Sequence, residues 1–154
     1  MRFAGRVFRH GADWLAEVPV FDAMSQGQTR AEALSMVEDW FESMVDSPGF
    51  AARAHRVSDK RFEISGSDLG PMISLLLQRL RQRSGLSLAE VAERLGAKSR
   101  NAYARYERGD SVPSVEKLDE LLQAVSEGSD LVVGMSSQRS NGARISPRIG
   151  ARRR

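Results

Sequence analysis

The chain has 154 residues, of which 41% are hydrophobic and 28% charged, so its composition is that of an ordinary soluble protein with one large or two small domains. It has no cysteine, which excludes a disulfide framework, thiolate metal ligands and a cysteine nucleophile. Its two histidines, His10 and His55, leave little material for metal or triad chemistry, and we expect no cofactor. No apolar run approaches the roughly 20 residues of a membrane-spanning helix. Residues 1–14 hold no uninterrupted apolar stretch, so we expect no secretory signal and a cytoplasmic protein.

The net charge of +3 is unevenly distributed along the chain. Residues 1–69 hold 8 basic and 11 acidic side chains, residues 70–138 hold 9 of each, and residues 139–154 hold 6 arginines and no acid. The basic balance therefore comes from the C-terminal segment and is by itself no argument for nucleic acid. Residues 136–154 are rich in Ser, Arg, Gly and Asn and predict a disordered basic tail, either an arm that attracts phosphates or a chain end without a role.

The N-terminal part begins with two predicted strands, residues 2–9 and 14–18, joined by a hairpin loop. In the second strand Trp14, Ala16 and Val18 share one face, and Pro19 ends it. An amphipathic helix is then predicted over residues 30–46. Thr29 and Glu32 have the spacing of a capping box at its start, and the following apolar side chains recur at helical spacing.

Residues 53–57 and 60–65 predict one or two weaker strands, so residues 1–65 are expected to form an α+β domain with one helix packed on a small sheet. The core of such a unit is thin, and dimerisation would help to stabilise it. Trp14 and Trp40 are expected in that core or in a dimer interface. Residues 66–70 are the predicted linker to the rest of the chain.

Beyond the linker the pattern is entirely helical and predicts an all-α domain over residues 71–126. Helices are expected over residues 71–84, 88–95, 100–108 and 115–125. The first carries Ile73, Leu76, Leu77 and Leu80 on one face. A short apolar run at residues 131–133 is either an extra strand or a dimer contact, and the sequence does not decide between them.

Residues 86–109 have the signals of a helix-turn-helix. Ser87 and Glu90 form a predicted capping box, and Leu86 can pack on Val91 as a hydrophobic staple. Gly96 suits a left-handed helix end, and Gly109 ends the next helix. Short helices that are separated by three or four residues with a glycine in the turn are typical of this motif.

The helix predicted at residues 100–108 has two opposite sides. At about 100° per residue, Ala102, Tyr103 and Tyr106 lie on one side. Asn101, Arg105 and Arg108 lie on the other, where amide and guanidinium groups can read base edges or hold phosphates. The charge pattern alone also fits a solvated helix face.

The segments GLSLAEVAERLG, ARYERG and VPSVEKLDELLQAV together resemble the Cro/repressor-type (XRE-like) helix-turn-helix family. The turn before the second motif helix is one residue longer than the commonest pattern. The resemblance implies a two-fold dimer on operator DNA, with that helix in the major groove. It implies base contacts from Ser99, Arg100, Asn101 and Arg105 and phosphate contacts from Ser87 and Lys98. Arg108 is a further DNA-binding candidate because it shares the side of Asn101 and Arg105. It also implies that Glu107 pairs with an arginine of the preceding helix, Arg81 being our choice, while Tyr103 and Tyr106 are core.

The N-terminal segment contains Val18-Pro19, the stretch Ser25-Gln26-Gly27-Gln28-Thr29 and the helix opening Glu32-Ala33-Leu34. Together these pieces resemble the HicB antitoxin pattern. The resemblance implies a partial RNase H-like fold that binds and neutralises a small basic, HicA-like, mRNA-cleaving toxin, while the helical domain represses the operon. Acidic residues in the N-terminal half would complement such a partner.

Two other functions stay open: a stand-alone repressor whose N-terminal domain senses a ligand or dimerises, and a residual nuclease. A magnesium-dependent nuclease needs gathered carboxylates. The spacing of Asp13, Glu17, Asp22 and Asp59 shows no metal-binding pattern, so we expect neither catalysis nor a metal site. His10 is expected in a solvated loop, and His55 on a strand surface.

Overall fold

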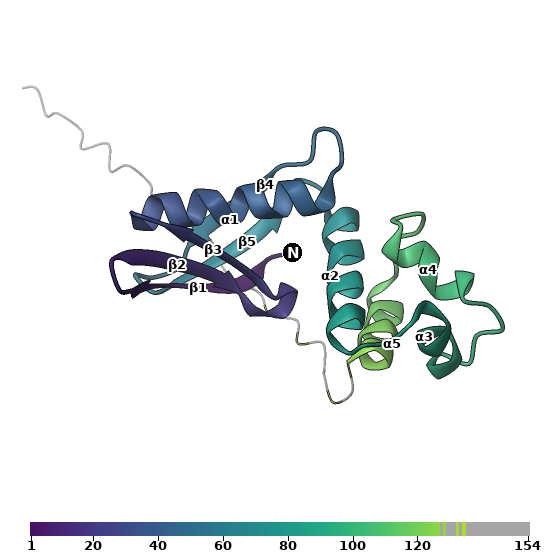
Figure 1. The fold of residues 1–154 in the computed structure, drawn as a ribbon. Helices are drawn as coiled ribbons and strands as arrows, with labels where there is room; N and C mark the ends of the chain where they lie inside the picture. Colours follow the sequence, from purple (N-terminus) through teal and green to yellow (C-terminus); the bar gives the residue numbers. More distant parts are fainter. Residues whose placement is uncertain (127, 129–131, 133, 135–154) are drawn as a thin grey trace, which may run out of the picture.

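The computed structural model describes residues 1–126, 128, 132 and 134, so the predicted basic tail and Leu131 and Val133 of the apolar run lie outside the described residues. The first half is a curled five-stranded sheet with one long helix across it (Figure 1). Its elements are β1 (Phe3–His10), β2 (Asp13–Val18), the 3-10 turn η1 (Pro19–Phe21), β3 (Ala23–Gly27), α1 (Arg30–Val45), β4 (Ala52–Arg56) and β5 (Arg61–Gly66). The strand order is β3-β2-β1-β5-β4, and every pairing is antiparallel.

The second half is helical. It consists of α2 (Leu69–Arg83), α3 (Leu88–Arg94), α4 (Asn101–Glu107) and α5 (Val115–Val125). These bounds confirm the predicted α+β and all-α halves and the positions of the four helices. Among the described helices, none combines the length and apolar character needed to cross a membrane.

The core of the sheet unit lies between α1 and one face of the sheet. Val37 and Phe41 of α1 are fully buried there, together with Val7 of β1 and Ile64 of β5. Phe21 of η1 closes one end of this core, where its ring packs edge-to-face against Phe41 at 4.9 Å between centroids. The apolar periodicity of residues 30–46 therefore positions α1 as predicted.

The strand β3 and the turn η1 were not predicted. The residues of β3 that face α1 include Ala23 and Gly27, which are buried but small, so the segment lacks the alternation of large apolar side chains that marks a strand. Gly27 is required at its position because a Cβ there would lie 2.5 Å from the Ala33 backbone nitrogen. The close approach of β3 to α1 thus removes the sequence signal for this strand.

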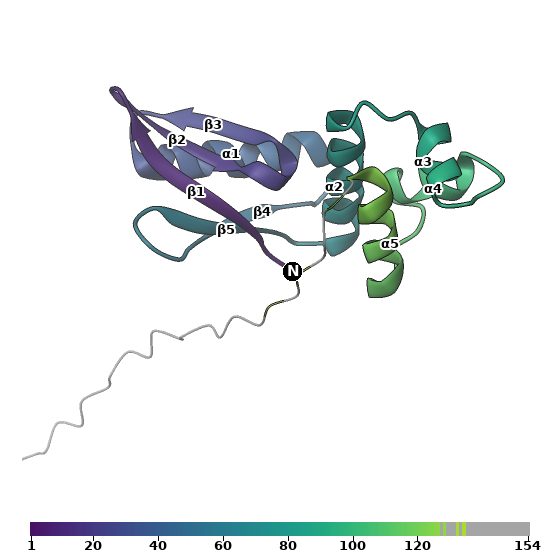
Figure 2. The same ribbon diagram turned by 90° about the horizontal axis from the view of Figure 1, so that it is seen from below.

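The helix α2 is packed on two sides, which Figures 1 and 2 both show as a column between the sheet unit and α3–α5. Towards the sheet unit, Arg79 Nε donates to the Phe21 carbonyl at 2.9 Å and Arg83 to the Pro19 carbonyl at 3.2 Å. Towards the helices, Ser74 Oγ donates to the Tyr106 carbonyl at 2.7 Å.

Two sequence predictions at this junction need correction. The single apolar face predicted for residues 71–84 is incomplete, because Met72, Leu75 and Ser74 are buried as well as the four predicted residues. The predicted linker 66–70 is also shorter in the structure, since β5 extends to Gly66 and α2 begins at Leu69. Asp68 caps α2 by accepting from the Gly70 backbone nitrogen at 3.0 Å. The junction is therefore a packed connection rather than a free tether.

Candidate nucleic-acid interface

The helices α3 and α4 form the helix-turn-helix geometry that the sequence predicts. Ser87 Oγ accepts from the Glu90 backbone nitrogen at 3.2 Å, and the Glu90 carboxylate accepts from the Ser87 nitrogen at 2.7 Å, which is the predicted capping box. These bonds hold the pKa of Glu90 below its ordinary value. Gly96 follows α3 with a φ of 66°, in the left-handed region that favours glycine.

One side of α4 is buried against α2 and α3. Tyr103 is fully buried, and its hydroxyl donates to the Leu77 carbonyl at 3.3 Å. Burial raises the pKa of Tyr103, so the hydroxyl keeps its proton and remains a donor. Tyr106 is also buried, as predicted. The prediction for Ala102 is wrong: it is exposed, and Ala104 is buried in its place, so the packed face of α4 runs from Tyr106 through Tyr103 to Ala104.

An ion pair fixes the orientation of α4 against α2. Arg81 donates through Nε to Glu107 Oε1 at 2.6 Å and through a terminal nitrogen to Glu107 Oε2 at 2.9 Å. The two side chains are 16% and 8% exposed, and the hydrogen bond to Glu107 raises the pKa of Arg81. This confirms the predicted partner of Glu107. The bidentate geometry fixes the rotation of α4 as well as its distance from α2.

The opposite side of α4 and the turn before it are exposed and basic. The exposed residues are those predicted to contact DNA on this helix and turn: Lys98, Ser99, Arg100, Asn101, Arg105 and Arg108. The one acidic side chain of this stretch, Glu107, is occupied by Arg81. The surface is therefore positive although residues 70–138 are neutral as a whole.

The polar groups on this surface have the following contacts. Ser99 Oγ accepts from the Asn101 backbone nitrogen at 3.2 Å, at the start of α4. Arg105 lies over the Tyr106 ring, 4.8 Å from its centroid, and donates to the Tyr106 hydroxyl at 2.8 Å. Arg108 Nε donates to Asp110 at 2.8 Å. Sequence reasoning placed Tyr106 in the core but missed its contact with Arg105, although their adjacency in sequence was visible.

The remaining predicted residue, Ser87, lies at the N-terminus of α3, where its side chain already caps the helix. It is exposed, so its hydroxyl can still reach a phosphate. The backbone N–H groups at this helix start provide further donors for an anion.

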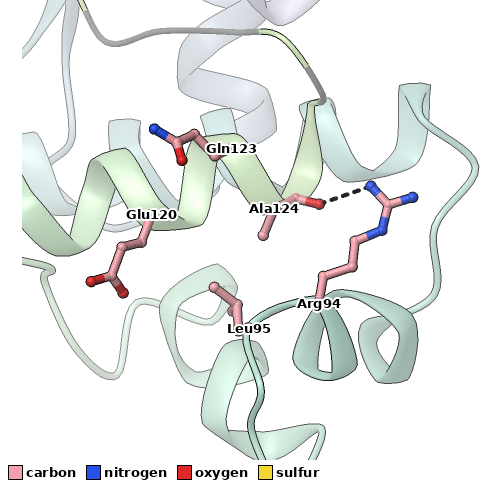
Figure 3. Close-up of a pocket in the computed structure, with 5 residues that line it drawn as sticks. All are labelled: Arg94, Leu95, Glu120, Gln123 and Ala124. Atoms are coloured by element: carbon pink, nitrogen blue, oxygen red, sulfur yellow. Dashed lines mark hydrogen bonds between the residues drawn. The ribbon is translucent and has the colours of Figure 1, made fainter.

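Two hollows lie away from Asn101 and Arg105, although Arg108 of the basic surface lines the second of them. One, of about 480 Å³, is open and lies between α3 and α5, where Arg94 donates to the Ala124 carbonyl at 3.2 Å (Figure 3). The other, of about 490 Å³, lies between the C-terminus of α1, the N-terminus of α2 and the loop after α4. Neither of these two lies within the sheet, where a ligand-sensing pocket would be expected.

The carboxylates considered for a nuclease site are engaged separately. Arg6 pairs with Glu17, Gln26 donates to Asp13, Arg79 pairs with Asp22, and Arg56 pairs with Asp59. Among the described residues, no three His, Asp or Glu side chains gather into a group that could hold a metal ion.

The two histidines lie on strands. His10 is exposed at the end of β1. His55 is half-buried on β4, with its Nε2 2.8 Å from Ser65 Oγ. His10 is therefore solvated as predicted, but it is the last residue of β1 and not part of the loop, since the tight turn begins at Gly11.

Comparison with known families gives a match in the helical half of the chain. Residues 77–125 match a family model described as a helix-turn-helix, of the Cro/C1 type. The match begins inside α2 and ends with α5, so it covers the basic surface and the pair of Arg81 and Glu107 that supports it. No curated protein matches the chain.

Proposed function

Taking residues 77–125 as a Cro/C1-type helix-turn-helix domain, we propose that the chain is a transcription regulator that places α4 in the major groove of operator DNA. The observation that carries this proposal is that α4 has one buried side and one exposed, basic side. Its tyrosines are buried, while Asn101 and Arg105 face outward on a surface of four basic side chains. Asn and Arg are the side chains that pair bidentately with adenine and guanine edges.

The residues divide into two roles in this proposal. Ser99, Arg100, Asn101 and Arg105 read base edges. Ser87, Lys98 and Arg108 hold phosphates, which sets the position of the protein but carries no sequence information.

Selection of a preferred DNA sequence from a random pool, followed by fluorescence anisotropy with Arg105→Ala, tests the proposal. The loss should be about 1–3 kcal/mol on the selected sequence if Arg105 pairs with a guanine, and much less on random DNA. The control is Arg53→Ala, an exposed arginine on β4. Equal losses on both DNAs would make Arg105 a phosphate contact, and no sequence enrichment at all would contradict the function.

For the sheet unit, we propose the HicB-like role: it binds a small basic, HicA-like, mRNA-cleaving toxin and blocks its active site, and it has no catalytic role of its own. The support is the segment from Val18 to Leu34 and the acidic character of α1. Glu32 and Asp39 of this helix and Asp46 at its C-cap are exposed. Complementary charge favours a basic partner, and an RNA-binding toxin is basic.

Co-expression with the product of the adjacent gene tests this role. A short basic chain should co-purify with the full-length protein and should bind more weakly to Asp39→Lys/Asp46→Lys. The control is Asp110→Lys, because Asp110 belongs to the helical unit. If the neighbour neither binds nor inhibits growth when expressed alone, the toxin role is wrong.

The second candidate is a stand-alone repressor whose sheet unit dimerises or senses a ligand. The packing of α2 favours it, because this helix contacts η1 on one side and α4 on the other, so a change in the sheet unit would reach the DNA-binding helix. A repressor that binds its operator without any toxin gene beside it would support this candidate.

A further inference from the structure

The two edges of the sheet differ in whether their outward backbone N–H groups are hydrogen-bonded within the chain. An edge strand presents unpaired N–H and C=O groups that can pair with another strand. The edges here are β4 and β3, which Figure 2 shows on opposite sides of the sheet. The difference between them bears on how two copies of the chain can associate.

The β4 edge is occupied by carboxylates of α1. Glu38 accepts from the Ala54 backbone nitrogen at 2.6 Å, and Glu42 accepts from the Ala52 nitrogen at 3.0 Å. Two N–H groups that an added strand would need are thereby satisfied within the chain. The side chains of Arg53, His55 and Arg56 also make this strand basic, so self-pairing here would bring like charges together.

The β3 edge has neither protection. Across the described residues, the backbone of Ala23–Gly27 makes no hydrogen bond other than those of its ladder with β2. The strand, Ala-Met-Ser-Gln-Gly, carries no charge, and Met24 is 56% exposed. Natural sheets usually protect such an edge with a charge, a proline or a covering element.

We propose that β3 pairs with β3 of a second copy, antiparallel and about a two-fold axis at Ser25. Pairing along the whole strand requires this register, which places Met24 opposite the partner's Gln26 and Asp22 opposite the partner's Gln28. No like charges meet in this register, so the strand is complementary to itself. The two five-stranded sheets become one continuous sheet.

The geometry suits a DNA-binding dimer. Arg79 of α2 contacts Phe21 and Asp22, which directly precede β3. Antiparallel pairing therefore places the two helical units at opposite ends of the joined strands, related by the two-fold axis. Operators of helix-turn-helix dimers have the same symmetry. The inference concerns assembly and stands without the toxin.

Disulfide trapping in the full-length protein tests the register, because the chain has no cysteine of its own. Met24→Cys/Gln26→Cys places a cysteine opposite a cysteine twice across the axis, and mild oxidation should convert most of the protein to a covalent dimer that reducing agent reverses. The control, Arg53→Cys/His55→Cys, has the same spacing on the β4 edge and should remain monomeric on a denaturing gel. Equal cross-linking of the two variants, or of neither, would overturn the proposal.

Charge variants test the same interface without a covalent cross-link. Met24→Lys/Gln26→Lys opposes lysines across the axis and should raise the dimer dissociation constant at least tenfold by light scattering, while mixing it with Met24→Glu/Gln26→Glu should restore dimers. A wild-type monomer at tens of micromolar, or a lysine variant that stays dimeric, would contradict β3 pairing. A lysine variant that stays dimeric but loses a co-purifying toxin would assign the edge to that partner instead. DNA selectivity of a monomer would leave the proposed regulator intact.

Discussion

Arg105 is held by the residue that follows it. Its guanidinium lies over the Tyr106 ring and donates to the Tyr106 hydroxyl, so its direction is fixed before any DNA is bound. Removing that bond leaves the side chain more rotamers to lose on binding, which costs affinity.

Tyr106→Phe should therefore weaken binding to the preferred sequence by about 1 kcal/mol, the value of one hydrogen bond, and weaken binding to random DNA less. Fluorescence anisotropy on the two DNAs measures the difference. The folded state should be little affected, since the buried ring is kept. An unchanged affinity for the preferred sequence would show that the bond has no positioning role.

The pair of Arg81 and Glu107 is expected to contribute to stability. Glu107→Ala leaves a largely buried guanidinium without its carboxylate and should lower the free energy of unfolding by about 3 kcal/mol. Arg81→Met/Glu107→Leu removes both charges and should recover most of that loss. Urea denaturation of the three proteins compares them, and a double variant no more stable than Glu107→Ala would contradict the argument.

His55 makes the stability depend on pH. Burial lowers its pKa below the ordinary value of 6.5, and Arg2 and Arg53 lower it further. Between the two pKa values the unfolded chain binds more protons than the folded chain, so stability should fall as the pH decreases below about 6.5. His55→Gln should flatten this dependence between pH 7.5 and pH 5.5 in chemical denaturation. A variant with the wild-type slope would remove His55 as its source.

At the scale of elements, the N-terminus of α3 separates folding from binding. Ser87→Ala loses the cap and should cost about 1 kcal/mol of stability. Ser87→Asp keeps an oxygen that can cap the helix, so stability should be retained, but its charge should repel a phosphate and weaken DNA binding. Thermal melting and anisotropy measure the two effects. Normal DNA affinity of Ser87→Asp would remove Ser87 from the interface.

The elements that the sequence predicts well are those with two independent signals. For α1 and α3, N-terminal capping and apolar spacing agree, and both helices begin where predicted. The predicted capping box is complete only at α3, because at α1 the Glu32 carboxylate accepts from the Gln28 nitrogen instead of the Thr29 nitrogen. For β3 the inward side chains are small and the strand was missed. In α4 the helical periodicity predicted that both tyrosines are buried. It did not show which of Ala102 and Ala104 is buried, because a small alanine side chain is compatible with the buried and the exposed side of a helix.

At the scale of the molecule, α2 joins the two halves. At about 100° per residue, Met72, Arg79 and Arg83 lie on the side of α2 opposite Ser74 and Arg81. Periodicity shows that a helix has apolar positions but not which element each side contacts, so the sequence predicted two units and not their joint.

The two halves should therefore unfold together. Both tryptophans, Trp14 and Trp40, lie in the sheet unit, so their fluorescence reports on that half. Most helical residues belong to α2–α5, so the helical circular dichroism signal reports mainly on the other half, with a smaller part from α1. Urea transitions followed by tryptophan fluorescence and by circular dichroism should coincide. The control is Arg79→Ala, which removes a bond between the halves and should shift both transitions equally. Two separate transitions in the wild type would contradict a shared core.

The two-sided packing of α2 has a consequence for recombination. Transfer of a DNA-binding domain to another protein by gene fusion needs a boundary that few contacts cross. Here a cut before α2 would strip Met72 and Arg79 of their counterparts, and a cut after it would remove the residues that support α4. A protein that acquired only the DNA-binding half would need new side chains on the side of α2 that packs against the sheet unit. The two halves are therefore expected to be transferred together.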